Sequence, residues 1–102
     1  MEQVVKFDRY VIDTLLPDLV GHDRRPAAFL VYLALWARAT DNRARTVSIS
    51  LRDLAEATGL SKRAVQGAVG RLAKRRLIDV ARISATAVPE YTVLRPWKRR
   101  AA

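Results

Sequence analysis

Residues 50–72, SLRDLAEATGLSKRAVQGAVGRL, contain two helix-start signals eleven residues apart with a glycine between them. Ser50 is followed three residues later by Asp53, the S-x-x-D form of a capping box, so a helix should begin directly after Ser50. Gly59 can adopt the left-handed conformation that ends a helix, and Ser61 can cap a second helix by accepting a first-turn N–H. The stretch therefore predicts two short helices joined by a tight turn.

The residues before this unit predict two more helices and a strand. Pro26 suits the first turn of a helix, and the apolar stretch after it predicts a buried central helix that ends near Thr40. The expected main core contributors of this helix recur at i, i+3, i+4 and i+7; they are Phe29, Leu30, Leu33 and Trp36. A further helix is expected around Tyr10 to Val20, with Pro17 limiting its regularity. TVSIS, residues 46–50, alternates as a short half-buried strand does.

After the second capped helix, residues 77–83 and 90–94 alternate between apolar and polar positions, with the turn-compatible SATAVP between them. This pattern predicts a β-hairpin, and the expected inward residues are Ile78, Val80, Tyr91 and Val93. The predicted fold class is α+β, mainly α, with about four helices, a short strand and a C-terminal hairpin. We expect one domain over residues 1–102, with residues 1–24 as an N-terminal extension and residues 95–102 as a frayed basic tail. A flexible arm along the phosphates is the first interpretation of this tail, and packing of Trp97 on the hairpin is an alternative.

The charge of the chain is concentrated at one end. The formal net charge is +9, and residues 61–102 contain 11 Lys and Arg against 2 Asp and Glu, whereas residues 1–60 contain 8 of each kind. Such asymmetry indicates a polyanionic partner, either nucleic acid or an anionic membrane surface. We favour nucleic acid, because the apolar face of the second capped helix is small and is needed by the core, unlike the faces of interfacial helices.

The composition limits the cellular compartments in which the protein is expected. The chain has no cysteine, which fits a reducing compartment, and no apolar run reaches the roughly 20 residues that span a bilayer. We therefore expect a cytoplasmic protein of prokaryotic type, associated with the nucleoid when bound, with no membrane partner, no metal and no cofactor.

The order of these elements, together with LAEATGLSKRAVQGAVGRLAKRRLI, resembles the winged helix-turn-helix family of prokaryotic DNA-binding proteins. The resemblance covers about Pro26 to Leu94, and its most specific residues are Ala55, Gly59, Leu60, Ser61, Val65 and Leu72. It implies that the helix from Ser61 to Arg76 is a recognition helix that enters the major groove and that the hairpin is the wing. This chain departs from the family in its wing tip, SATAVPE, which has no Lys or Arg for the minor groove.

The spacing of the second capped helix separates an inner face from an outer one. Val65, Ala68, Val69 and Leu72 gather on the core face, and two glycines lie on the opposite face. In a helix interior each glycine costs about 0.8 to 1 kcal/mol relative to alanine, so we interpret them as clearance for a partner. The alternative is that they are tolerated glycines on a solvated basic face, since the cost in helix propensity is modest. The expected DNA-binding residues of the chain are Arg52, Ser61, Lys62, Arg63, Gln66, Gly67, Gly70, Arg71, Lys74 and Arg82. Arg75 and Arg76 suit a structural role at the helix C-terminus, where positive charge complements the dipole.

Enzyme motifs are absent from the sequence, so we expect no catalytic residue. His22 has no ligand-type partner at metal spacing, and capping and the helix dipole explain Asp53 and Glu56. The leading hypothesis is a sequence-specific double-stranded DNA-binding transcriptional regulator, with a homodimer interface in the segment Val4 to Val20. Two alternatives stay open: a plasmid or phage replication-initiator or maintenance module, and a winged-helix protein-protein interaction module.

Overall fold

The computed structural model describes residues 3–40 and 43–98 of the chain. Along the chain these residues form η1 (Val11–Leu15), η2 (Pro17–His22), α1 (Pro26–Ala39), β1 (Thr46–Ser48), α2 (Leu51–Thr58), α3 (Lys62–Lys74), β2 (Ile78–Ala81) and β3 (Glu90–Val93). Because η1 and η2 are continuous, the described residues contain four helical segments and three strands. This confirms the predicted α+β winged helix-turn-helix fold.

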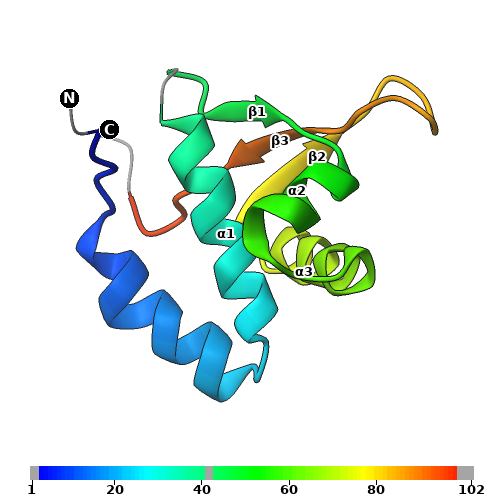
Figure 1. The fold of residues 1–102 in the computed structure, drawn as a ribbon. Coiled ribbons are helices and arrows are strands. Elements are labelled where there is room, and N and C mark those ends of the chain that lie inside the picture. The colour runs from blue at the N-terminus through cyan, green and yellow to red at the C-terminus, as the bar shows by residue number, and fades with distance from the viewer. Residues whose placement is uncertain (1–2, 41–42, 99–102) are drawn as a thin grey trace.

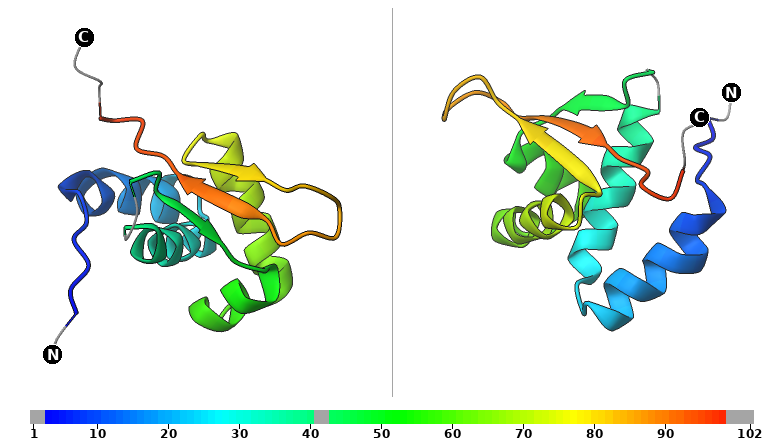
Figure 2. Two further views of the ribbon diagram at one scale, coloured as in Figure 1. Left: turned by 90° about the horizontal axis from the view of Figure 1, so that it is seen from above. Right: turned by 180° about the vertical axis from the view of Figure 1, so that it is seen from behind.

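The three strands form one antiparallel sheet in the order β1-β3-β2. The hairpin is β2 and β3, which pair Ile78 with Val93 and Val80 with Tyr91. Strand β1 pairs with the other side of β3, with Val47 opposite Tyr91, so β2 is an edge strand. The loop between β2 and β3 projects beyond the helices as the wing (Figure 2).

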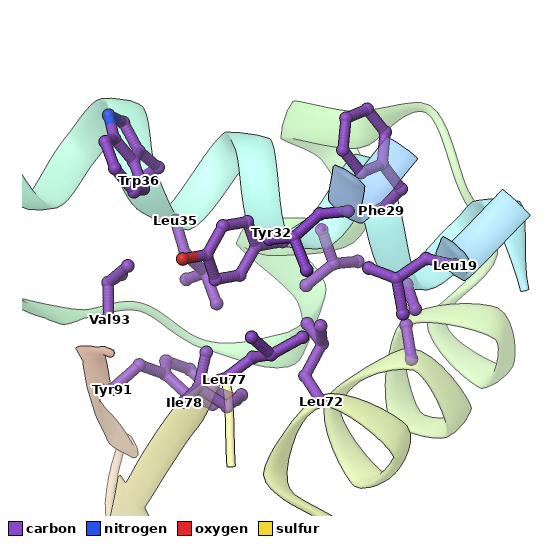
Figure 3. Close-up of a cluster of buried hydrophobic side chains, with 14 of the residues drawn as sticks. Leu19, Phe29, Tyr32, Leu35, Trp36, Leu72, Leu77, Ile78, Tyr91 and Val93 are labelled. Atoms are coloured by element: carbon purple, nitrogen blue, oxygen red, sulfur yellow. The ribbon is translucent and has the colours of Figure 1, made fainter. Parts of the chain in front are cut away.

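One face of the sheet completes the core with the helices. Ile78, Tyr91 and Val93 are buried, and their side chains meet those of α1 and α3 (Figure 3). The prediction that Val80 points inward is wrong, because Val80 is 38% exposed. It lies on the edge strand β2, whose outer side has no neighbouring strand, although its partner Tyr91 on the central strand is buried.

Helix α1 lies between the N-terminal segment on one side and α2 and α3 on the other (Figure 1). Its predicted bounds are confirmed, and Phe29 and Trp36 are buried as expected. Leu30 is 44% exposed, however, and Leu33 is only partly buried. The residues that fill the core in their place are Ala28, Val31, Tyr32, Leu35 and Ala39. A helix that is apolar on nearly every side does not define its inner face by periodicity.

The N-terminal segment is helical from Arg9 to His22, but with wide turns around Pro17. The amide of Leu16 donates to the carbonyl of Val11, five residues back. Proline has no N–H and its ring crowds the carbonyl four residues before it, so the expected irregularity at Pro17 is confirmed. This segment buries Val11, Leu15 and Leu19 in the hydrophobic core, and its second part, η2, contacts α1.

The predicted fraying of the basic tail is wrong for its first residues. The Trp97 ring stacks on Tyr10 at a centroid distance of 4.5 Å, and its Nε1 donates to Asp8 Oδ2 at 3.1 Å. Arg95 Nη1 lies 3.7 Å from the same Asp8 oxygen. The tail up to Lys98 therefore joins the N-terminal segment, and its last four positions lie outside the described residues.

Candidate nucleic-acid interface

Local hydrogen bonds and one glycine fix where α2 begins and ends and where α3 begins. Ser50 Oγ accepts the amide of Asp53 at 3.0 Å, and Ser61 Oγ accepts the amide of Ala64 at 3.0 Å.

The turn between α2 and α3 is formed at Gly59, which adopts a left-handed φ of 76°. Thr58 Oγ1 donates to the Leu54 carbonyl at 2.8 Å and accepts the amide of Leu60 at 3.3 Å. The predicted helix-turn-helix geometry is thus built from short-range contacts, and both caps are confirmed.

Burial divides α3 into the two predicted faces. Val65, Ala68 and Leu72 are buried, while Val69 is partly buried and packs against the core. The outer face is exposed and combines cations, one amide and two glycines: Arg63, Gln66, Gly67, Gly70 and Lys74. This surface presents hydrogen-bond donors around a strip of bare helix backbone.

The two glycines of α3 are not needed for packing within the domain. A Cβ built at Gly67 or at Gly70 meets no other atom within 4 Å. Neither residue has a positive φ, because the glycine that does is Gly59. The glycines therefore leave open space on the outer face rather than room for a neighbouring element.

Gly67→Ala should raise the free energy of unfolding by about 0.5 to 1 kcal/mol, because alanine has the higher helix propensity and nothing obstructs its Cβ. Equilibrium denaturation in urea measures this change. The contrasting substitution is Gly59→Ala, which should lower stability by about 1 kcal/mol because an L-residue is strained at its left-handed φ. A loss of stability in Gly67→Ala would contradict the open-space interpretation.

Three of the predicted cations come together from three separate elements. Arg52 of α2, Lys62 of α3 and Arg82 of the wing line one open cavity of about 250 Å³, together with wing residues 85–89. All three side chains belong to exposed residues. Arg52 also lies 3.8 Å from Glu56 on its own helix, a pair open to water and hence weak. The cavity, called here the cation cleft, concentrates positive charge beside the N-terminus of α3.

Ser61 and Arg71 are placed differently from the other predicted site residues. The Ser61 oxygen is engaged in the cap of α3. Arg71 is only partly exposed, and its charge contributes to lowering the pKa of Asp23 in the N-terminal segment. Arg71 therefore acts at least partly within the domain.

Arg75 joins the C-terminus of α3 to the N-terminal segment. Its Nη2 lies 2.6 Å from Asp18 Oδ2, and its Nη1 lies 2.7 Å from Asp23 Oδ2. The hydrogen bond from Arg75 is the main cause of the lowered pKa of Asp23. A structural role was expected for Arg75, but these two ion pairs rather than the helix dipole account for it.

Arg75→Met should lower the free energy of unfolding by about 1 to 3 kcal/mol, because two partly buried carboxylates lose their donor. The pKa of Asp23 lies below its usual value of 3.8 in the folded state. The contribution of Asp23 to the free energy of unfolding is therefore complete above about pH 4, and it is lost as the pH falls through the pKa of the folded state. Denaturation at pH 7 and pH 3 measures both effects. The stability difference between variant and wild type should shrink at pH 3, and the control Arg76→Met should show neither effect.

His22 has more neighbours than its sequence position indicated. Its Nδ1 lies 3.8 Å from Asp18 Oδ1 and 3.5 Å from Asp23 Oδ1, and ligand-type atoms of the three residues fall within 4.8 Å of one another. The expectation that His22 lacks such a partner is therefore wrong. Arg75 already forms an ion pair with each of the two carboxylates, so a metal ion would compete with a bound guanidinium here.

The wing contains an apolar feature that sequence reasoning missed. Ile83 is 99% exposed and Val88 is 56% exposed. The alternation in LIDVARI included Ile83 in a strand, but β2 ends at Ala81. The basic residue nearest to this surface is Arg82, whose Nη1 donates to the Ala85 carbonyl at 3.4 Å. The wing thus presents one cation, Arg82, at its base and two exposed apolar side chains, Ile83 and Val88.

A short helix, a tight turn and a second helix with an exposed basic face, followed by a projecting hairpin, define a winged helix-turn-helix domain, a class used chiefly for binding DNA. The helix-turn-helix domain family matches residues 25–78, so the chain belongs to this family. Its fold is also similar to the crystal structure of the AntR antimony-specific transcriptional repressor, with a TM-score of 0.51 and 23% identity. That likeness covers 93% of this chain and 74% of the AntR chain. No curated protein matches the chain. Within the described residues, no helix is both long and apolar enough to cross a membrane.

Proposed function

We propose that the chain is a sequence-specific double-stranded DNA-binding protein that acts as a transcriptional regulator, without enzymatic activity. The observation that carries the proposal is the outer face of α3, where Arg63, Gln66 and Lys74 surround the bare strip at Gly67 and Gly70. An α-helix fits the major groove, where Arg pairs with guanine and Gln with adenine. Helix α3, Lys62–Lys74, which is shorter than the helix from Ser61 to Arg76 expected from the sequence, therefore enters the groove, with the glycines allowing close approach.

The cation cleft supplies the sequence-independent part of the interface. Arg52, Lys62 and Arg82 surround one cavity, and cations in such a position hold backbone phosphates and set the register of a recognition helix. The wing tip itself offers no cation, so we assign phosphate contact to Arg82 and no minor-groove readout to the wing.

We propose that two copies act together through the segment Val4 to Val20, because one winged helix contacts too few base pairs to select a site. Val11, Leu15 and Leu19 of this segment are used by the core, but Val4 is 78% exposed and Ile12 is 49% exposed. A dimer would read two half-sites about 34 to 36 Å apart. The protein would act in the prokaryotic cytoplasm, on the nucleoid.

Regulation of transcription fits the fold likeness to AntR, a transcriptional repressor. The response of AntR to antimony is not carried over, because this chain has no cysteine and therefore no thiolate for a soft metalloid. A replication-initiator or maintenance role would use the same DNA-binding surface. A protein-interaction role is the alternative of another class, since the glycine strip could also accept a partner helix.

Selection of bound sequences from a random duplex pool tests this proposal. We expect enrichment of one site with two-fold symmetry, and affinity that falls about 10³-fold or more between 50 and 200 mM salt if six or more phosphates are contacted. An enriched site without symmetry would contradict the dimer. Failure to enrich any site, together with salt-independent binding to a protein partner, would instead support the interaction module.

A further inference from the structure

A second basic cavity lies at the end of the sheet away from the wing. It is formed where the chain enters β1 and where it leaves β3 (Figure 1). Its volume is about 520 Å³, and the described residues that line it include four cations and no carboxylate. The cations are Arg43, Arg45, Arg95 and Lys98. We call this cavity the far-end pocket.

Arg45 is the most constrained of these cations. Its guanidinium carbon lies 4.3 Å from the centroid of the Trp36 ring, and its Nε and Nη2 are buried without a hydrogen-bond partner. Its backbone has a φ of 56°, uncommon for a residue other than glycine, and its carbonyl accepts the amide of Val93 at 2.9 Å. The fold thus holds a partly buried guanidinium whose hydrogen-bonding capacity is only partly used.

Among the described residues, the cations around Arg45 outnumber the carboxylates that act on them. Arg95 faces the same Trp36 ring at 6.0 Å, and burial, followed by the charge of Arg95, lowers the pKa of Arg45. The carboxylate that acts on Arg45 is Asp8, which is shared with Arg95 at 3.7 Å and with the Trp97 indole. Within the described part of the chain, one shared carboxylate therefore faces several cations, and a bound anion would relieve their repulsion.

We propose that the far-end pocket binds the phosphate group of a small molecule, as a ligand site separate from the DNA-binding surface. Guanidinium forks match phosphate oxygens in geometry and charge. The pocket lies at the opposite end of the sheet from the wing (Figure 2), so a duplex held by α3 and the wing would not reach it. This inference goes beyond the proposed function and does not rest on it, because binding is measured without DNA.

Calorimetric titration with inorganic phosphate and with pyrophosphate tests the proposal, using chloride at matched ionic strength as the control ligand. We expect one saturable site and a rise in melting temperature with phosphate. The double variant Arg43→Gln/Lys98→Gln, which leaves the Arg45–Trp36 contact in place, should bind about tenfold more weakly or worse, since charge-assisted hydrogen bonds are lost. Arg45→Met, which keeps an aliphatic side chain against Trp36, should show a loss at least as large.

The matched control is Arg9→Gln/Arg38→Gln, which removes two exposed charges elsewhere and should retain the affinity for phosphate. Equal affinity in wild type and Arg43→Gln/Lys98→Gln, or no saturable binding to wild type, would overturn the proposal. DNA affinity should be the same in the two double variants. A tenfold larger loss of DNA affinity in Arg43→Gln/Lys98→Gln than in the control would also overturn it, by showing that these cations bind the duplex.

Discussion

Trp36→Ala should lower the free energy of unfolding by about 3 to 5 kcal/mol, the usual cost of truncating a buried aromatic residue to alanine. Trp36 is 1% exposed and joins parts of the chain that are distant in sequence. Its ring stacks with Phe7 at 5.5 Å and lies 6.4 Å from Trp97. Because a domain of this size is stable by only about 5 to 15 kcal/mol, the variant should lose a large fraction of its total stability.

The indole N–H of Trp36 adds a second contribution, because Nε1 donates to the Lys6 carbonyl at 2.8 Å. Trp36→Phe keeps a ring against Arg45 but removes this donor, so it should lose clearly less stability than Trp36→Ala. Urea denaturation followed by circular dichroism measures both variants. A loss below about 1 kcal/mol in Trp36→Ala would show that the N-terminal segment and the tail do not pack on Trp36, since cavity formation in a core costs more.

Gly67→Glu should weaken DNA binding by about 100-fold or more, because a carboxylate facing phosphates costs several kcal/mol and a long side chain prevents close approach. The fold should tolerate the change, since a Cβ at Gly67 meets nothing within 4 Å. Fluorescence anisotropy with the selected duplex measures the affinity, and circular dichroism checks folding.

Gly21→Glu is the matched control for this prediction. Gly21 is exposed, lies in η2 and has nothing within 4 Å of a built Cβ. The control therefore makes the same chemical change on another element, and it should bind DNA nearly as well as wild type. If Gly67→Glu and Gly21→Glu bind equally well, the glycines of α3 do not face the duplex.

Short-range signals explain why the helix-turn-helix unit was predictable from the sequence. The caps at Ser50 and Ser61 and the turn at Gly59 each depend on residues within four positions, and all three occur in the structure. The outer face of α3 was also predictable from the sequence, because Val65, Ala68 and Leu72 fix the inner face by helical spacing.

Features that depend on residues distant in sequence were not predictable. No periodicity distinguishes Leu30 from Val31 in a helix that is apolar all round, and the contacts of α1 with η2, α2, α3 and the sheet decide which of its residues are buried. The pairing of Arg75 with Asp18 spans 57 positions. The packing of Trp97 was not predictable for the same reason, because its stacking on Tyr10 joins residues from the first and last parts of the sequence. The cation cleft likewise combines side chains from α2, α3 and the wing.

The most direct test of the account is the ratio of affinities for the selected duplex and a scrambled duplex, measured for wild type and for Arg63→Ala/Gln66→Ala. If the outer face of α3 reads base edges, the double variant should lose about 1 to 3 kcal/mol of discrimination for each bidentate contact removed. Its affinity for the scrambled duplex should fall much less, because the variant keeps the phosphate contacts proposed for Arg52, Lys62 and Arg82. An unchanged ratio in a folded Arg63→Ala/Gln66→Ala variant would contradict the assignment of α3 as the recognition helix.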